Sequence, residues 1–252
     1  GWNQTHDDWA LFAQQGVVQV VRDESGRIVA SGAVLPLEPG AAWISMILVA
    51  PALRSQGLGR KVFEQCLRTV QASGRVAMLD ATPAGEKLYA QFNFAPQWQL
   101  SRWQRQANSP SKQSAPPPPP PSTQIDALAA LDEMALGLNR SKMLGQFSAR
   151  RGACLVRHSQ ACSLVRAGRF ARHIGPLLAP DEASAAQLLR EVADSDASAL
   201  LIDVPDERPL MHQQLAASGF ERIRSFTRMS LGEPVPHGRL PFIHAIAGPE
   251  YG

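Results

Sequence analysis

Arg54, Gly57 and Gly59 lie in the string RSQGLGRK, which follows an apolar segment and a proline and opens an amphipathic segment. Glycines at this spacing let backbone N–H groups approach an anion closely. The first turn of a helix adds free N–H groups and partial positive charge. Arg60 and Lys61 supply further positive charge. These residues fit a phosphate group, although the glycines alone could equally shape a turn.

The string lacks the signatures of two other phosphate-binding loops. It has no third glycine at the spacing of the dinucleotide fingerprint, and no Gly-Lys-Ser or Gly-Lys-Thr of the nucleoside triphosphate loop. Dinucleotides and nucleoside triphosphates are therefore disfavoured as ligands.

Composition excludes several other classes of protein. The chain has 252 residues, 19% charged and 44% apolar, which is typical of a folded globular protein. A net charge of +3 without a basic, aromatic-rich block predicts no nucleic-acid partner. The six histidines and three cysteines show no metal-ligand spacing, so we expect no metal and a reducing, cytoplasmic location. The sequence has no apolar run long enough to span a membrane and no leader pattern, so we expect no membrane partner.

A run of six prolines, Pro116–Pro121, divides the chain. Consecutive prolines adopt an extended helix and donate no backbone hydrogen bonds, so residues 107–124 are predicted to be a semi-rigid linker. The predicted domains are residues 1–106 and 125–252.

Both parts predict mixed α/β structure. In the first, we expect strands over 17–21, 28–35, 41–49, 75–81 and 99–106, with helices over 57–73 and from 83 through 92. In the second, we expect helices over 125–148, 181–195 and 208–220, a hairpin over 152–159 and 161–168, and strands over 172–180, 199–205 and 221–231. The strings RVAMLDATP…LYAQFNF and ALLIDVP…LAASGF share one order of elements, which indicates an internal repeat.

Two motifs resemble those of the GNAT acyltransferases. Val49-x-Pro51-x-x-Arg54-x-x-Gly57-x-Gly59 is similar to the family's acetyl-CoA pyrophosphate signature. YAQFNF, Tyr89 to Phe94, resembles its Tyr-x-x-x-Gly-Phe, with Asn93 in place of the glycine. Asparagine tolerates the left-handed conformation at a helix end better than other non-glycine residues, so this departure is mild.

Longer strings, among them WISMILVAPALRSQGLG and IHAIAGPEYG, resemble a subgroup of GNAT proteins with two tandem domains, the second one diverged. The resemblance implies an α/β (α+β) fold in which each GNAT-like domain has a mixed, mostly antiparallel sheet flanked by helices. Members of the subgroup have a first strand ahead of the position that matches GWNQT, so we expect the N-terminal domain here without that strand.

The resemblance also implies an activity, which is transfer of an acetyl group from acetyl-CoA to a primary amine of a small molecule or a protein by direct attack in a ternary complex. The alternative is a non-catalytic CoA-binding module that regulates another process.

The family's cofactor residues carry over by position. The pyrophosphate would be wrapped by Arg54, Ser55, Gln56, Gly57, Leu58, Gly59 and Arg60, and the pantetheine arm would meet the backbone of Ile47, Leu48 and Val49. One N–H of this strand would polarise the thioester carbonyl. Tyr89 would contact the cofactor and act as general acid toward the CoA thiolate, although it could be an ordinary half-buried aromatic residue.

The acceptor side is less defined. Asp80 is the carboxylate best placed by sequence to act as base, but it could instead cap the next helix or bind a cationic substrate. Trp2, Asn3 and Gln4 match the position at which the family lines its acceptor pocket. The same segment could be a helix-capping turn, because Thr5-x-x-Asp8 resembles a capping box.

The second domain lacks these features. The string DEASAAQ places acidic residues without glycine at the helix start, where a pyrophosphate would be repelled, and Leu215 stands at the position that matches Tyr89. We therefore expect this domain not to be catalytic. It could cover the acceptor site or form a homodimer, and the sequence does not decide between these roles. Asp132 and Arg140 match residues typical of the subgroup and are expected to pair within it.

Overall fold

The structure is a computed structural model that describes residues 3–107, 117–233 and 238–252. The N-terminal half contains α1 (His6–Gln15), β1 (Val17–Arg22), β2 (Ile28–Leu37), β3 (Ala41–Val49), the 3₁₀ turn η1 (Pro51–Leu53), α2 (Leu58–Ala72), β4 (Val76–Ala81), α3 (Pro83–Ala90) and β5 (Phe94–Arg105). From β1 to β5 the strands and α-helices follow the predicted order, whereas α1 was not among the predicted helices.

The C-terminal half contains α4 (Ser122–Leu136), α5 (Ser141–Ser148), β6 (Cys154–His158), β7 (Ala161–Arg166), β8 (Arg172–Leu178), α6 (Glu182–Ser195), β9 (Leu200–Pro205), α7 (Pro209–Ala217), β10 (Glu221–Leu231), η2 (Leu240–Phe242) and β11 (Ile243–Ala245). The chain thus repeats one α/β arrangement, as its sequence indicates.

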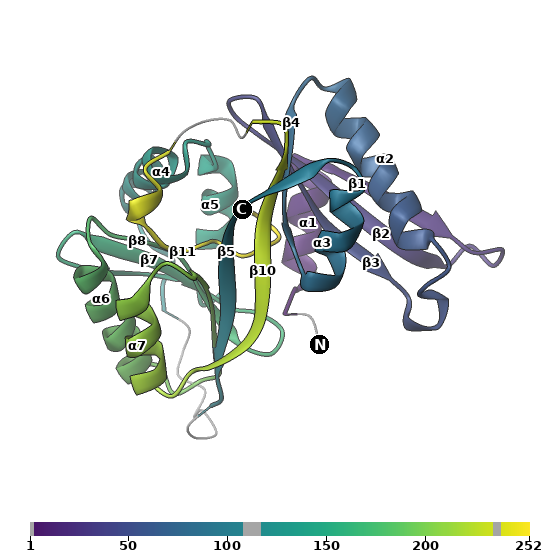
Figure 1. Ribbon diagram of the computed structural model, residues 1–252. Helices are drawn as coiled ribbons and strands as arrows, with labels where there is room; N and C mark the ends of the chain where they lie inside the picture. The colour runs from purple at the N-terminus through teal and green to yellow at the C-terminus, as the bar shows by residue number, and fades with distance from the viewer. Residues whose placement is uncertain (1–2, 108–116, 234–237) are drawn as a thin grey trace.

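The two halves share one sheet, in which the order is β1-β2-β3-β4-β10-β5-β9-β8-β7-β6, with β11 paired to β8. Each half gives its last long strand to the other, because β10 pairs with β4 while β5 pairs with β9, and β5 and β10 also pair with each other. Figure 1 shows these two strands running between the lobes. The expected mixed, mostly antiparallel pairing is confirmed, since only β3–β4 and β8–β9 pair in parallel among the described strands. The sheets of the two domains join into one continuous sheet.

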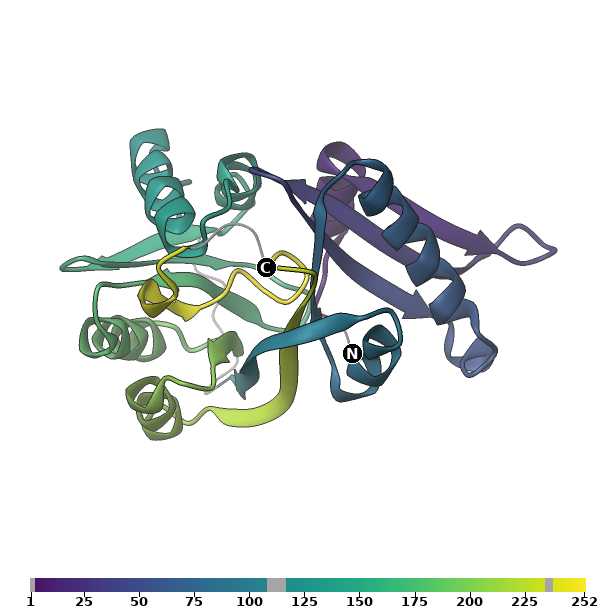
Figure 2. The ribbon, with the colours of Figure 1, turned by 45° about the horizontal axis from the view of Figure 1, so that its top comes forward.

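Alternating side chains of β2 bury the two faces of the N-terminal sheet. Ala33 and Leu35 pack with Leu11 and Phe12 of α1, whereas Val34 packs with Phe63 and Cys66 of α2. Figure 2 shows α2 lying along the sheet. This alternation follows from the period of two in a strand, and it fixes α2 over the strands that lead into the glycine-containing loop.

One predicted helix is wrong. Residues 125–148 form two helices because Gly137 adopts a left-handed conformation, φ +76°, and ends α4. Arg140 then turns back to bind Asp132 through two hydrogen bonds, at 2.8 and 2.6 Å, which confirms the predicted pair. Helix α4 begins at Ser122, so the last residues of the predicted linker are helical. Residues 108–116 of that linker lie outside the described residues.

Candidate active site

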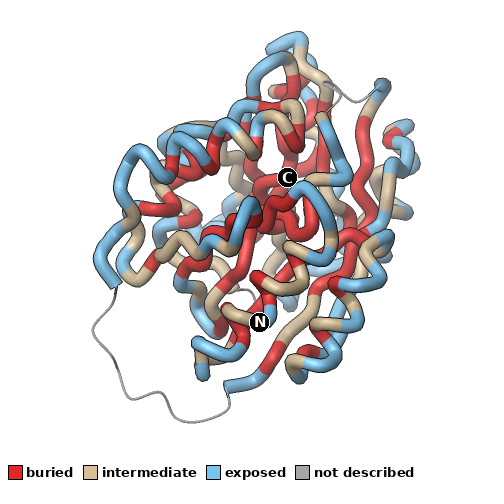
Figure 3. Tube along the Cα trace, turned by 90° about the vertical axis from the view of Figure 1, so that its left-hand side faces the viewer, coloured by how far each residue is buried: buried red, intermediate tan, exposed pale blue. Residues whose placement is uncertain are grey.

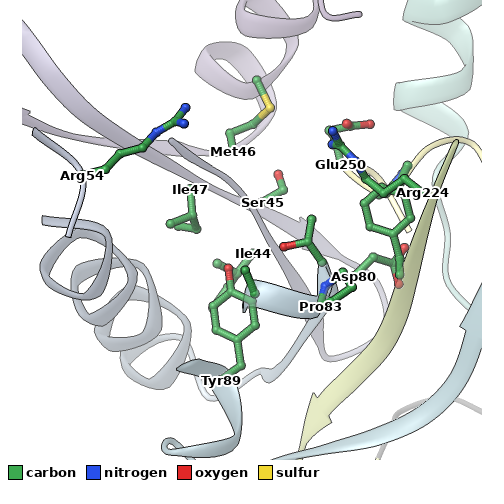
Figure 4. A pocket seen from close by; sticks show the side chains of 14 residues that line it. Ile44, Ser45, Met46, Ile47, Arg54, Asp80, Pro83, Tyr89, Arg224 and Glu250 are labelled. Atoms are coloured by element: carbon green, nitrogen blue, oxygen red, sulfur yellow. The ribbon is translucent and has the colours of Figure 1, made fainter. Parts of the chain in front are cut away.

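A cavity of about 770 Å³ lies where the two halves meet. The N-terminal half lines it with Ile44, Ser45, Met46, Ile47, Arg54, Asp80, Thr82, Pro83, Ala84 and Tyr89, and the C-terminal half with Arg224, Phe226, Pro249 and Glu250. Figure 4 shows Arg54 and Tyr89 on one side of this cavity and Arg224 and Glu250 on the other. The cavity therefore brings three of the predicted cofactor residues, Ile47, Arg54 and Tyr89, together with side chains of the other half, whereas the rest of the predicted set does not line it.

The cavity opens because β3 and β4 separate. Their parallel pairing runs from Ala41–Val76 to Trp43–Met78 and stops there. Beyond this point β3 is bulged against β2, where Met46 takes φ +56° and accepts a hydrogen bond from the Ser31 hydroxyl at 3.2 Å. A bulge bends its strand and leaves a residue out of the ladder. The divergence of β3 from β4 directs the Ile44–Ile47 segment along the cavity.

The glycine-containing loop leads into the first turn of α2. Gly57 precedes the helix with φ +79°, and Ser55 also has a positive φ of 62°. The first bond of the helix runs from the Lys61 N–H to the Gly57 carbonyl at 3.0 Å, so the N–H groups of residues 58–60 come before it. A Cβ added at Gly57 would meet no atom within 4 Å. The loop therefore presents backbone donors to open space.

Two arginines of this loop differ in their surroundings. Arg54 lines the cavity. Arg60 instead binds side chains on the protein surface. Its guanidinium donates to Glu64 at 3.0 Å and to Gln91 at 2.8 Å, and its guanidinium carbon lies 4.9 Å from the centre of the Phe92 ring. The structure thus places Arg54 nearer the space that a ligand would fill.

Tyr89 projects from α3 into the cavity, and its ring packs against Phe63 at a centroid distance of 4.7 Å and against Phe94 at 6.2 Å. Asn93 ends this segment with φ +63°, as its left-handed preference predicts. Burial, and to a smaller extent the charge of Cys66, raises the pKa of the Tyr89 phenol to about 12. Tyr89 therefore holds its proton at neutral pH and is a hydrogen-bond donor facing the cavity (Figure 4).

Asp80 lies at the end of β4, and both of its carboxylate oxygens accept hydrogen bonds from Arg228 of β10, each at 2.9 Å. The Asp80 side chain is fully buried, and the Arg228 guanidinium carbon lies 4.6 Å from the Trp43 ring and 4.2 Å from the Trp98 ring. A carboxylate held by both oxygens in this way joins the two halves. The geometry favours this ion-pair role over the predicted role of proton acceptor.

We expect Asp80→Asn to destabilise the protein by about 3–5 kcal/mol, because Arg228 would stay buried without its counter-ion. Urea unfolding followed by circular dichroism measures this loss. Asp23→Asn is the matched control, since Asp23 pairs with Arg27 on the surface at 3.0 Å and should matter far less. Equal stability losses in both variants would contradict the joining role of Asp80.

The predicted acceptor residues contact the C-terminal half. The Asn3 amide accepts from the N–H groups of Phe170 and Ala171, at 2.9 and 3.0 Å, and donates to the Ala171 carbonyl at 3.0 Å. This side chain therefore fixes a loop and lies outside the large cavity. Gln4 donates to Glu250, which lines that cavity. Trp2 lies outside the described residues.

The alternative interpretation of this segment is confirmed. Thr5 and Asp8 form a capping box at the start of α1, with the Thr5 N–H donating to the Asp8 carboxylate at 2.6 Å.

Sequence reasoning missed the role of residues 243–252, all of which are buried, and Figure 3 shows the C-terminus among other buried segments. The Trp43 indole N–H donates to the Pro249 carbonyl at 2.9 Å, and Arg140 donates to the Tyr251 carbonyl at 3.0 Å. The Tyr251 hydroxyl donates to Asp8 at 2.5 Å. Glu250 thereby reaches the cavity on a segment held by both halves. Its only sequence signal was its resemblance to the tandem subgroup.

The C-terminal half fills its own counterpart of this cavity. Its parallel pairing of β8 with β9 stops at Ile174–Ile202, and β11 then lies against β8 with Ile243 opposite Leu178. The Ile246 N–H donates to the Asp203 carbonyl of β9 at 3.0 Å. The gap between the two strands is thus occupied by the chain itself.

The helix that follows in this half is also unlike α2. Asp181 caps α6 by accepting from the Ser184 N–H at 2.8 Å. This carboxylate takes the place of an anion at the helix start. Leu215, at the position that matches Tyr89, is fully buried and has no acidic proton.

The described residues also bear on the sequence-based expectations about metals, cysteines and membranes. Within them, no group of three or more His, Cys, Asp or Glu side chains is arranged to hold a metal ion. The three cysteines are free thiols. None of the helices in the described ranges is both long and apolar enough to cross a bilayer.

Known proteins share this architecture. The family description "Acetyltransferase (GNAT) domain" matches residues 14–96 and, in a second version, residues 128–240. The uncharacterized N-acetyltransferase YitH of Bacillus subtilis is 25% identical over 230 residues, which cover 88% of this chain and 81% of that protein.

Solved structures agree at the level of the fold. A Pyrococcus horikoshii protein assigned as an acetyltransferase superposes with a TM-score of 0.79 at 20% identity, over 98% of this chain and 84% of its own. A tandem GNAT protein from the clavulanic acid biosynthesis pathway gives 0.59 at 16% identity, over 87% and 85%. The chain belongs to the GNAT acetyltransferases and carries two such domains in tandem. It is an N-acetyltransferase, a class of enzyme that uses acetyl-CoA.

Proposed function

We propose that the N-terminal half binds acetyl-CoA and transfers its acetyl group to a primary amine by direct attack in a ternary complex. The observation that carries this proposal is the cavity that opens where β3 leaves β4. It has Arg54 at the end near the glycine-containing loop and Tyr89 beside the separating strands.

The residues present fit acetyl-CoA. The N–H groups of residues 58–60, the open space at Gly57 and the charge of Arg54 suit a pyrophosphate. The segment Ile47–Val49 offers backbone groups to an extended pantetheine arm at the bulged end of β3. Five further residues of this loop would surround the pyrophosphate: Ser55, Gln56, Leu58, Gly59 and Arg60.

Tyr89 is the proposed general acid. Because its phenol keeps its proton at neutral pH and faces the cavity, it can donate to the sulfur of CoA as the C–S bond breaks. When bound, acetyl-CoA supplies an activated thioester, and the chain supplies the position and the proton.

Direct attack is favoured over an acetyl-cysteine intermediate. Cys66, the cysteine nearest Tyr89, is fully buried, and burial raises the pKa of its thiol to about 12. A thiol of this kind is a poor nucleophile at neutral pH. The described residues that line the cavity include no cysteine.

Two-substrate initial rates test the ternary complex. Acetyl-CoA is varied at several fixed concentrations of a primary amine, with release of the CoA thiol as the readout. We expect double-reciprocal lines that intersect, whereas parallel lines would indicate an acetylated enzyme and contradict direct attack.

The filled second cleft predicts the stoichiometry of binding. Because β11 occupies the space between β8 and β9 and Asp181 caps α6, we expect one acetyl-CoA per chain. Isothermal titration calorimetry measures this number. Two equivalent sites would show that the C-terminal half also binds the cofactor.

A further inference from the structure

The C-terminal half completes the proposed acceptor side of the cavity. Arg224, Phe226, Pro249 and Glu250 face residues of β3 and β4 across it. Figure 4 shows Glu250 across the cavity from Tyr89, with Ser45 between them. An acceptor amine that approaches the thioester opposite the Tyr89 side would therefore meet this wall.

Cations hold Glu250 less tightly than they hold the neighbouring carboxylates Asp203 and Asp80. Asp203 accepts two hydrogen bonds from Arg102, at 2.7 and 2.9 Å, and Asp80 is held in the same way by Arg228. Glu250 accepts from the Gln4 amide, and its oxygen lies 4.0 Å from Arg102, whose charge Asp203 already offsets. The Glu250 side chain is only 8% exposed.

Charged groups on several elements surround Glu250. Burial raises its pKa above the ordinary value, as does the negative charge of Asp203 on β9. Arg102 on β5 and Arg166 on β7 lower the pKa, but by less than burial raises it. The other charged side chains that line the same cavity are Arg54, Asp80 and Arg224.

A second buried polar group, from β3 of the N-terminal half, lies between Tyr89 and Glu250 (Figure 4). The Ser45 hydroxyl is buried, lines the cavity and has no hydrogen-bond partner in the described part of the chain. A buried polar group without a partner costs free energy unless a ligand satisfies it. A nitrogen placed between Ser45 and Glu250 would give the hydroxyl such a partner.

We propose that Glu250, a residue of the C-terminal half, receives the acceptor amine and takes its proton during acetyl transfer. This inference rests on the proposed function and assigns the acceptor as a primary amine that enters as a cation from the C-terminal side. The second domain then supplies part of the active site, although its own cofactor cleft is filled.

The step balances in atoms and charge. An ammonium acceptor first loses one proton to solvent. The neutral nitrogen then forms the N–C bond as the C–S bond breaks, Glu250 takes the second proton from nitrogen, and Tyr89 donates its proton to sulfur. Glu250 later releases its proton to water and Tyr89 regains one from water. The products are the acetylated amine and the CoA thiol.

The pH profile of kcat/KM tests this role with four primary amines of different size and charge: tyramine, putrescine, L-lysine and kanamycin. A base acts only when deprotonated, so kcat/KM should rise with pH through the Glu250 pKa, above its ordinary 4.5. The pKa of the amine differs from one amine to the next, whereas the pKa of Glu250 does not. A rise that stays at the same pH with all four amines therefore belongs to Glu250.

We expect Glu250→Gln to lower kcat/KM about 100-fold and to leave the Kd of acetyl-CoA unchanged. It should also remove the rise of kcat/KM with pH that all four amines share, which is the common limb of the pH profile. Glu250→Asp should keep the limb at a reduced rate. Tyr251→Phe is the matched control, because it loosens the same segment from Asp8 while leaving the carboxylate in place, and it should keep the limb.

If Glu250→Gln kept the wild-type kcat/KM and the common limb, the role of Glu250 would be overturned while the proposed function would stand. Loss of the limb in Tyr251→Phe would have the same meaning. A wild-type protein that binds acetyl-CoA but acetylates none of the four amines would contradict the proposed function, and with it the role of Glu250.

Discussion

Gly57→Glu is expected to weaken acetyl-CoA binding by about 100-fold or more, which corresponds to about 2.8 kcal/mol. The new carboxylate would project from the loop into the open space before α2, where the proposed pyrophosphate lies, and like charges repel. Isothermal titration calorimetry measures the affinity, and circular dichroism checks the fold.

Gly57→Ala is the matched control for backbone strain. Any side chain at Gly57 is strained because φ is +79°, and this strain costs about 1–2 kcal/mol in alanine and in glutamate alike. Alanine adds no charge, so its effect on affinity should be much smaller. Unchanged affinity in the glutamate variant would overturn the assignment of this loop to the pyrophosphate.

Tyr89→Phe is expected to lower kcat about 10²- to 10⁴-fold while the Kd of acetyl-CoA stays within a few-fold of wild type. Phenylalanine keeps the packing against Phe63 but removes the proton donor from the cavity. Since burial raises the pKa of Tyr89 to about 12, the wild-type rate should show no loss from tyrosine ionisation at neutral pH. Stopped-flow detection of the CoA thiol measures kcat.

The other tyrosine provides the control. The Tyr251 hydroxyl donates to Asp8 and helps to hold the segment that carries Glu250. Tyr251→Phe should therefore lower the Tm, and it should reduce kcat far less than Tyr89→Phe does. A wild-type kcat in Tyr89→Phe would exclude the acid role.

The loop, helix start and tyrosine of the proposed cofactor side could be located from the sequence because their determinants are local. The apolar run before Pro51, the glycine that takes a positive φ and the tyrosine of the next helix all lie within about one α/β unit of sequence. Asp181 at the start of α6 was equally readable, because a helix cap is set by neighbours along the chain. Such features need no knowledge of the tertiary contacts.

The proposed acceptor side could not be predicted because its contacts join residues far apart in sequence. Arg228 lies 148 residues from Asp80 and turns a predicted base into half of an ion pair. The exchange of β5 and β10 between the halves follows no local pattern, since either strand could have closed its own sheet. Glu250 reaches the cavity because its neighbours in sequence contact both halves, Pro249 through Trp43 and Tyr251 through Arg140.

The most direct test is the release of CoA thiol by the wild-type protein, with and without a primary amine, accompanied by mass spectrometry of the amine. The account predicts release that depends on the amine, one acetylated amine per thiol, and loss of both in Tyr89→Phe. Thiol release at the same rate without the amine, or cofactor binding without release on any amine, would contradict it.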